Sequence, residues 1–240
     1  MIHVSDKAMF HIHTARCKHA TGTDREYIEK AISLGADEIW FTDHAPYPGD
    51  RIGTRMLFSE REEYVTTMNA LRKEYAGDIM LKLGMEMEYF PSYEEYIRET
   101  RNSGIFDLLI LGQHYYERED GTFYFAKKNE ENSDERYGLS EGMIRGIKTG
   151  LFDVVAHPDR IFRNCREWTE DMAAISQKII DAAKGTDIYL EKNYASSLKR
   201  DHYWDEFWRM VPPEVKTLKG LDAHSVDSLR FLDFDYTPVH

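Results

Sequence analysis

The sequence has few cysteines and no long apolar segment. Its 240 residues include only Cys17 and Cys165, which form neither a CxxC pair nor a disulfide framework, as is typical of proteins from a reducing compartment. The opening residues, MIHVSDKAMF, contain no basic stretch followed by an apolar run. No run elsewhere approaches the ~20 apolar residues that a transmembrane helix needs. We therefore expect no signal peptide, no membrane partner and a cytoplasmic location.

Positive charge is also scarce. The chain carries 31 Lys and Arg residues against 43 Asp and Glu residues, a formal net charge of −12. Such a chain repels nucleic-acid backbones and anionic membranes, so we expect no nucleic-acid partner. A GxGxxG loop before a helix and a Walker-type loop are both absent, which leaves dinucleotide and P-loop sites without support. A phosphate-bearing substrate would need local positive charge, which bound metal ions could supply.

Short apolar runs alternate with longer segments of helical periodicity. The expected strands are 9–12, 38–42, 79–85, 106–111, 152–156, 187–190 and 218–221. The expected helices are 24–34, 60–75, 93–102, 139–149, 169–184 and 203–210. Thr23 with Glu26, and Ser59 with Glu62, predict the starts of the first two helices, and Gly35 predicts the end of the first. The polar segment 127–138 is predicted to be a solvated loop.

This alternation predicts repeated βα units and a mainly parallel sheet. Most of the strands are short and apolar, which is typical of strands buried on both faces. An open doubly wound sheet and a closed barrel both fit, and periodicity alone does not choose between them. No linker or change of composition interrupts the chain, so we expect one domain over residues 1–240.

Most of the histidines lie at or just after the ends of the expected strands. His11 and His13 form an H-x-H pair, whose side chains would point to the same side of a strand. The other potential donors at these strand ends and their loops are His19, His44, Glu86, His114, His157, Asp222 and His224. In parallel α/β folds the carboxyl ends of the strands share one face, where active sites are built. Histidines scattered through a core have no reason to prefer that edge, so the sequence predicts a metal site there.

The mixture of donors narrows the metal and the chemistry. Imidazoles with a few carboxylates suit Zn, Fe or Mn better than Ca or Mg. A carboxylate that bridges two such ions places them about 3.5–4 Å apart, the spacing of two-metal hydrolytic sites. Such a pair of ions can hold a hydroxide for attack and neutralise phosphoryl oxygens, so we favour hydrolysis over redox chemistry. No serine or cysteine nucleophile is evident, so we expect no covalent intermediate. A non-catalytic module that binds metal or a partner is the alternative from another class.

At these residues the sequence resembles the polymerase-and-histidinol-phosphatase (PHP) superfamily. The segments HxH, TDH, GxE, QH, AHPD and DAH occur in the family's order between residues 9 and 225. The resemblance implies a distorted, TIM-like (βα)7 barrel, and so favours the closed form. It also implies that the chain is a metal-dependent phosphoesterase with a trinuclear site.

The resemblance assigns nine ligands to three metal ions. His11, His13, Glu86 and Asp222 would hold one ion, Glu86 would bridge to a second completed by His114 and His157, and His19, His44 and His224 would hold the third. Glu86, Asp222 and His224 are expected to take part directly in catalysis, in which a metal-activated hydroxide attacks the phosphorus. Glu88 is the alternative to Glu86, which fits the G-x-E pattern. Asp43 is expected to orient a ligand.

Within the superfamily, three segments resemble the histidinol-phosphatase branch. They are residues 55–58 (RMLF), 84–91 (GMEMEYFP) and 110–114 (ILGQH). That branch releases phosphate from L-histidinol phosphate, so we expect this small phosphomonoester as the substrate. From Asn193 the branch carries an N-x-S-G-x-R-like segment, whereas this chain reads NYASSLK. Because the glycine is absent and Lys199 comes one place late, a nucleotide or phosphotyrosine substrate stays open as the alternative.

Basic residues near the ligands are candidates for binding the phosphate. Arg160, three residues after His157, is preferred because a guanidinium can bind phosphate through two donors. A surface ion pair is the alternative role for Arg160. The further candidates are Lys199, Arg55, Arg16 and Lys18. The sequence does not predict the oligomeric state.

Overall fold

A seven-stranded parallel sheet forms the centre of the computed structural model, which describes residues 2–125 and 133–232. In spatial order its strands are β1 (Ala8–Ile12), β2 (Glu38–Phe41), β3 (Met80–Met87), β4 (Leu108–Leu111), β7 (Val154–Val155), β8 (Tyr189–Asn193) and β9 (Thr217–Gly220). All neighbouring pairs are parallel. The seven predicted strands are therefore confirmed. A separate antiparallel hairpin, β5 (Tyr116–Glu117) and β6 (Phe123–Tyr124), is not predicted by the sequence.

The sheet closes on itself because the segment after β9 bonds to β1. The Leu221 N–H donates to the Phe10 carbonyl at 2.9 Å, and the His13 N–H donates to the Ala223 carbonyl at 2.9 Å. Ile12 and Ala223 also form a parallel bridge. These bonds exclude the open doubly wound sheet and confirm the closed (βα)7 barrel.

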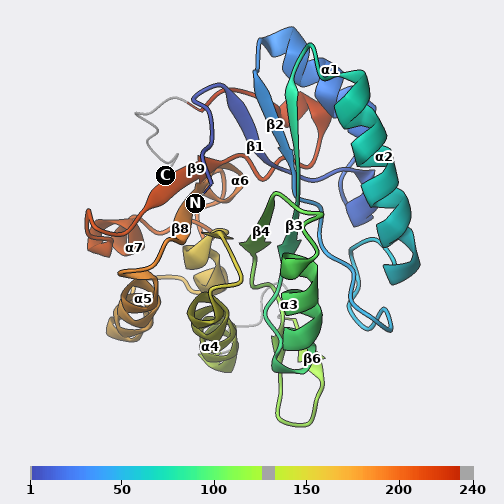
Figure 1. Ribbon diagram of the computed structural model, residues 1–240. Helices are drawn as coiled ribbons and strands as arrows, with labels where there is room; N and C mark the ends of the chain where they lie inside the picture. The colour runs from blue at the N-terminus through green and yellow to red at the C-terminus, as the bar shows by residue number, and fades with distance from the viewer. Residues whose placement is uncertain (1, 126–132, 233–240) are drawn as a thin grey trace.

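The helices lie around the outside of the strands (Figure 1). They are α1 (Asp24–Leu34), α2 (Arg61–Glu74), α3 (Glu94–Asn102), α4 (Ser133–Thr149), α5 (Glu170–Ala183), α6 (Tyr194–Ser197) and α7 (Asp205–Met210). Within the described residues, none is long and apolar enough to cross a lipid bilayer. The short α6 is not predicted by the sequence, whereas the other six correspond to predicted helices.

One of the two predicted helix caps is confirmed and the other is wrong. The capping box of Thr23 and Glu26 is present at α1, and Gly35 ends that helix with a φ of 83°. The cap predicted at Ser59 is wrong. A short 3-10 turn precedes α2, and the Glu60 side chain accepts the Leu57 N–H at 2.6 Å. The predicted loop 127–138 is wrong from Ser133 onward, where α4 begins, and its residues 127–132 lie outside the described residues.

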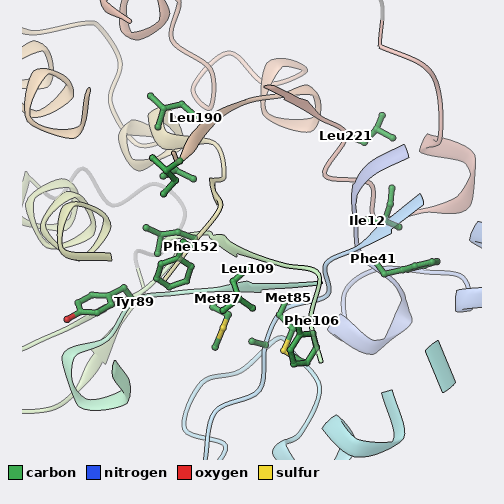
Figure 2. Close-up of a cluster of buried hydrophobic side chains, with 14 of the residues drawn as sticks. Ile12, Phe41, Met85, Met87, Tyr89, Phe106, Leu109, Phe152, Leu190 and Leu221 are labelled. Carbon is green, nitrogen blue, oxygen red and sulfur yellow. The ribbon is translucent and has the colours of Figure 1, made fainter. Parts of the chain in front are cut away.

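Two separate apolar clusters show which side chains face into the barrel. The larger one contains strand residues such as Ile39 and Leu83 together with helix residues such as Ile28, so it lies between the strands and the helices. Figure 2 shows part of this layer. The smaller cluster consists of buried residues in the strands or directly after them, with Phe10 and Trp40 among them. It includes no helix residue and therefore fills the interior of the barrel.

A bulge in β1 turns His11 into the barrel. Phe10 belongs to the inner cluster and Met9 to the outer layer, so strict alternation would place His11 on the outer side with Met9. The pairing of β1 with β2 shifts register between Met9 and Ile12, and His11 has a φ of 68°. The bulge places His11 and His13 on the inner side. The side chains therefore alternate between the two sides of the strand from His11 to His13, as predicted, but Phe10 and His11 both face inward.

Candidate metal centre

Glu86 lies at the centre of a ring of imidazoles. It is the penultimate residue of β3 and is almost fully buried. One carboxylate oxygen, Oε1, lies 3.1 Å from His157 Nε2 and 3.9 Å from His114 Nε2. The other oxygen, Oε2, lies 3.2 Å from His13 Nε2, 3.2 Å from His44 Nδ1 and 3.5 Å from His11 Nε2. A single carboxylate thus faces five of the seven predicted histidines.

Asp222 and the remaining histidines complete the cluster. Asp222 Oδ1 lies 3.3 Å from His13 Nε2 and 3.8 Å from His11 Nε2. His224 Nε2 lies 3.0 Å from His19 Nε2, and the His13 and His224 rings stack with their centroids 4.4 Å apart. The structure therefore brings all nine predicted donors together at one mouth of the barrel.

The donor groups that the structure brings together share residues, so they do not match the three predicted ligand sets one to one. Four groups are compact enough to hold an ion: His13, His44 and His224; His11, His13 and Asp222; His13, Cys17 and Asp43; and His44, Glu86 and His114. The second falls within the first predicted set. The others combine donors that the resemblance assigns to different ions or not at all. The assignment of ligands to individual ions accordingly stays a prediction.

Most of the imidazoles are oriented through Nδ1 and present Nε2 to the cluster. His19, His114 and His224 donate from Nδ1 to the carbonyls of Cys17, Gly112 and Asp222 at 2.7, 3.0 and 2.9 Å. His13 Nδ1 contacts Cys17 Sγ at 3.3 Å, and that thiol donates to Asp43 at 3.0 Å. Asp43 thus reaches a predicted ligand through Cys17. Such hydrogen bonds fix the tautomer and the direction of a ligating ring.

The surroundings of Glu86 fit bound metal ions. Glu86 Oε2 and His44 Nδ1 are buried yet lack a hydrogen-bond partner within the described part of the chain, and such orphaned polar atoms are rare in proteins. A Cβ atom on Gly112 would lie only 1.8 Å from Glu86 Oε1, so the absent side chain makes room for this carboxylate. Imidazole and carboxylate donors are suited to Zn, Fe or Mn.

The charges of the cluster are strongly coupled. Burial alone would raise the pKa of Glu86, but His44, His114 and His11 hold it well below its usual range. Burial would lower the pKa of His13, yet the adjacent carboxylates of Asp222 and Glu86 raise it to about 9. Burial lowers the pKa of His224 to about 4. At neutral pH the metal-free cluster therefore mixes neutral imidazoles with imidazolium.

Metal affinity is expected to increase as the pH rises from about 7 to about 9. The pKa of His13 is raised to about 9 in the metal-free protein. Below that pH a proton on Nε2 therefore competes with the metal. Each proton released on binding changes the affinity by about tenfold per pH unit. Zinc titrations against a chelator of known proton affinity, at several pH values, measure this slope. An affinity that stays constant over this range would contradict the prediction.

A cavity of about 280 Å³ opens beside the cluster. Its walls include His44, His224 and Asp222 together with three arginines, Arg55, Arg160 and Arg163. Arg160 Nη1 lies 3.4 Å from Asp222 Oδ2, next to the predicted metal ligands. Small anions that enter this cavity would therefore meet both the imidazole cluster and guanidinium groups.

The other predicted phosphate binders are less well placed. Arg55 lines the cavity but forms a buried two-point ion pair with Glu88, at 2.8 and 3.0 Å. This pair also occupies Glu88, the alternative to Glu86. Lys199 is exposed and is not among the residues that line the cavity.

Arg16 and Lys18 are bound to acidic residues nearby. Arg16 pairs with Asp24 and Glu63, and Lys18 pairs with Glu60 at 2.9 Å. Neither basic residue lines the cavity beside the cluster. The structure therefore gives no support to their predicted approach to the site.

Two residues that the sequence analysis missed belong to this region. Glu191, on β8, contacts His11 Nδ1 at 2.6 Å. An acidic residue directly after an apolar strand is the signal that could have identified it, but the predicted strand ended at Leu190. Arg163 lines the cavity, contacts Glu135 Oε1 at 3.3 Å and lies over the Phe125 ring at 4.6 Å. Arg163 lies at no predicted strand end and in no motif, so the sequence gave no such signal for it.

The fold and the cluster together define a class: α/β barrels that gather histidines and acids at one mouth. The PHP domain profile matches residues 10–195. This chain belongs to the PHP domain family.

Several relatives carry a more specific name. A Deinococcus radiodurans protein named "Probable histidinol-phosphatase" is 33% identical over 156 residues, which cover 62% of this chain and 59% of the relative. The chain thus matches less than two thirds of that relative's length. Among solved structures, one from Listeria monocytogenes has a TM-score of 0.74 at 20% identity, with 92% of this chain and 97% of that chain covered.

A third comparison bears on the ligands of a relative. The histidinol phosphate phosphatase of Lactococcus lactis, solved in complex with zinc, L-histidinol and phosphate, has a TM-score of 0.69 at 19% identity. The match covers 92% of this chain and 87% of that one. At such identities the structural matches establish the shared fold.

Proposed function

We propose that this chain is a metal-dependent phosphatase that hydrolyses a small phosphomonoester. The observation that carries the proposal is the convergence of nine donor residues around Glu86, beside a cavity of about 280 Å³ that also contains Arg160. We treat residues 1–240 as one catalytic domain, because the strands that close the barrel come from the two ends of the described chain.

The cluster would hold two or three Zn, Fe or Mn ions through His11, His13, His19, His44, Glu86, His114, His157, Asp222 and His224. When bound, such ions act as Lewis acids toward the phosphoryl oxygens and make water acidic enough to act as a nucleophile. Arg160 would bind the phosphoryl group, since its guanidinium lies at the cavity wall beside Asp222. Arg163 would extend that positive wall. Asp222 and His224 would exchange a proton with the leaving oxygen, since both line the cavity.

L-Histidinol phosphate is the substrate that we propose. The relatives named as histidinol-phosphatases and the zinc-, histidinol- and phosphate-bound Lactococcus structure support this choice. The reaction adds water across the P–O bond and gives L-histidinol and inorganic phosphate.

A phosphate-release screen tests the proposal directly. The purified chain is loaded with Zn, Mn or Fe and offered L-histidinol phosphate, nucleoside monophosphates, phosphotyrosine and an aryl phosphate. We expect L-histidinol phosphate to give the highest kcat/KM. Faster turnover of a nucleotide or phosphotyrosine would assign another substrate to the same site. No release from any substrate, with metal bound, would leave a metal-binding module as the function.

Replacement of Arg160 is expected to weaken substrate binding while metal binding persists. Arg160→Ala removes a charged hydrogen-bond donor, typically worth 1.5–3 kcal/mol, so kcat/KM should fall by about 10- to 100-fold. Elemental analysis and steady-state kinetics measure the two effects separately. Arg166→Ala is the matched control, because Arg166 is exposed and does not line the cavity. Unchanged kinetics in Arg160→Ala would remove this residue from the site.

A further inference from the structure

Glu191 is a buried acid that lies outside the nine predicted ligands. It is on β8, fully buried, and its neighbour Leu190 belongs to the outer apolar layer, so Glu191 faces the barrel interior. A buried carboxylate is costly unless its oxygens are fully hydrogen-bonded. Its partners therefore indicate why the fold retains it.

The contacts of Glu191 are all made with hydrogen-bond donors. Oε1 lies 2.6 Å from His11 Nδ1, and Oε2 accepts from the His157 N–H at 3.3 Å and from Asn193 Nδ2 at 2.9 Å. The Asn193 amide is oriented independently, because its oxygen accepts the Ser196 N–H at 2.8 Å. With donors on every side, the carboxylate acts only as an acceptor, and His11 carries a hydrogen on Nδ1.

This arrangement determines which nitrogen of His11 faces the predicted metal centre. With Nδ1 bonded to Glu191, Nε2 is directed at the cluster, 3.5 Å from Glu86 and 3.8 Å from Asp222. A carboxylate behind a ligating imidazole fixes the tautomer and makes the ring a better ligand.

Glu191 also contacts two residues whose backbone conformations are unfavourable. His11 and His157 have φ angles of 68° and 33°, in the left-handed region that residues other than glycine seldom adopt. Such conformations persist only where the surroundings enforce them. One oxygen of Glu191 binds the His11 ring, and the other binds the His157 backbone N–H.

The neighbouring strand, β9, leaves space for the Glu191 carboxylate. A Cβ atom on Gly220 would lie 1.7 Å from Glu191 Oε1. Gly220 pairs with Asn193 between β9 and β8. The missing side chain at Gly220 therefore permits the position of Glu191, as Gly112 permits that of Glu86.

We propose that Glu191 is a positioning residue for the metal centre, which fixes the metal-binding tautomer of His11 and the backbone turn at His157. Asn193 supports it and, through the Ser196 N–H, links it to the start of α6. This inference rests on the metal centre of the proposed function but not on the identity of the substrate. It also gives Asn193 a structural role that is independent of substrate binding.

Glu191→Gln tests the proposal, because glutamine keeps the shape but not the acceptor pattern. If the amide NH₂ faces His11, the ring must accept at Nδ1 and carry its hydrogen on Nε2, which blocks metal binding. If the amide oxygen faces His11, the NH₂ meets the His157 N–H and the Asn193 NH₂. We expect zinc affinity, measured by chelator competition, to fall by about 10- to 100-fold. The visible spectrum of the Co(II)-substituted protein should also change, because it reports ligand geometry.

Glu38→Gln is the matched control. Glu38 is likewise a buried strand glutamate, but it begins β2 and accepts the Ser5 N–H at 2.9 Å, away from the cluster. We expect its zinc affinity and Co(II) spectrum to equal those of the wild type. A purely structural role for Glu191 predicts a lower unfolding temperature of the metal-free variant, with the affinity and spectrum of the folded protein unchanged. That result would overturn the proposal.

A second variant keeps the test decisive if Glu191→Gln does not fold. Asn193→Ala removes one donor to the same carboxylate and should weaken zinc binding by about fivefold, the typical net contribution of one hydrogen bond. Unchanged zinc binding in Asn193→Ala would then overturn the proposal. Failure of the phosphatase proposal looks different: the metal-loaded wild type would release no phosphate, while Glu191→Gln would still bind zinc more weakly.

Discussion

Replacement of Glu86 by glutamine is expected to abolish catalysis and most metal binding. Glu86 faces five imidazoles at 3.1–3.9 Å, more than any other carboxylate in the cluster. Glutamine has nearly the same volume but one oxygen fewer and no negative charge, so it cannot bridge two cations. Because metal ions would supply most of the electrostatic stabilisation of the transition state, we expect the rate to fall by at least about 10³-fold.

Three measurements check this expectation. Elemental analysis should show fewer bound ions per chain, phosphate release should be nearly lost, and the increase in unfolding temperature on adding metal should shrink, since a ligand stabilises only the state that binds it. Glu38→Gln again serves as the control for a buried strand glutamate. Full metal content together with wild-type turnover in Glu86→Gln would refute the central role of this residue.

The metal-free protein should also lose stability at neutral pH in the same variant. Histidine neighbours hold the pKa of Glu86 well below its usual range despite burial. A carboxylate whose pKa is lower in the folded state than in the unfolded state stabilises the fold at pH values above the unfolded-state pKa. This stabilisation is lost as the pH falls through the folded-state pKa. Glu86→Gln lacks that contribution at neutral pH, so its metal-free form should unfold at a lower temperature there than the metal-free wild type.

The positions of the ligands could be predicted because they follow from topology. In a parallel barrel every strand delivers its carboxyl end to the same mouth. A histidine or acid that follows an apolar run is therefore placed without knowledge of any side-chain contact. His44, His114 and His157 follow β2, β4 and β7 in this way, and the structure brings them together as expected.

The residues that support the ligands could not be predicted, because they depend on local departures from regular geometry. The sequence around His11 does not indicate the bulge that turns this residue inward. Histidine seldom adopts a φ of 68°, so such a conformation is not expected at this position. Glu191 lies one residue beyond the expected end of its strand, and its role depends on His11 and Gly220 in distant segments. Lys199 was placed by its distance along the chain from Asn193, but the path after α6 leaves it exposed.

Addition of a single methyl group at Gly112 is expected to damage the centre without changing any ligand. The new Cβ would lie 1.8 Å from Glu86 Oε1 and 2.4 Å from its Cδ, far inside van der Waals contact. Glu86 is enclosed by imidazoles and cannot move away without leaving the cluster. The other way to relieve the overlap is to shift the end of β4, but the Gly112 carbonyl orients His114 at 3.0 Å. Either response displaces a predicted ligand.

Gly112→Ala should therefore lower metal content and reduce turnover by about 100-fold, the cost of displacing a reacting group by about 1 Å. Overpacking of the buried site should also destabilise the fold by about 1–3 kcal/mol. Gly77→Ala is the matched control, since a Cβ there meets no atom within 4 Å and its stability should change by less than about 0.5 kcal/mol. Elemental analysis, turnover and thermal unfolding of the two variants separate these effects. If Gly112→Ala kept wild-type metal content and rate, Glu86 would have to be mobile, and its placement at the centre of the cluster would be wrong.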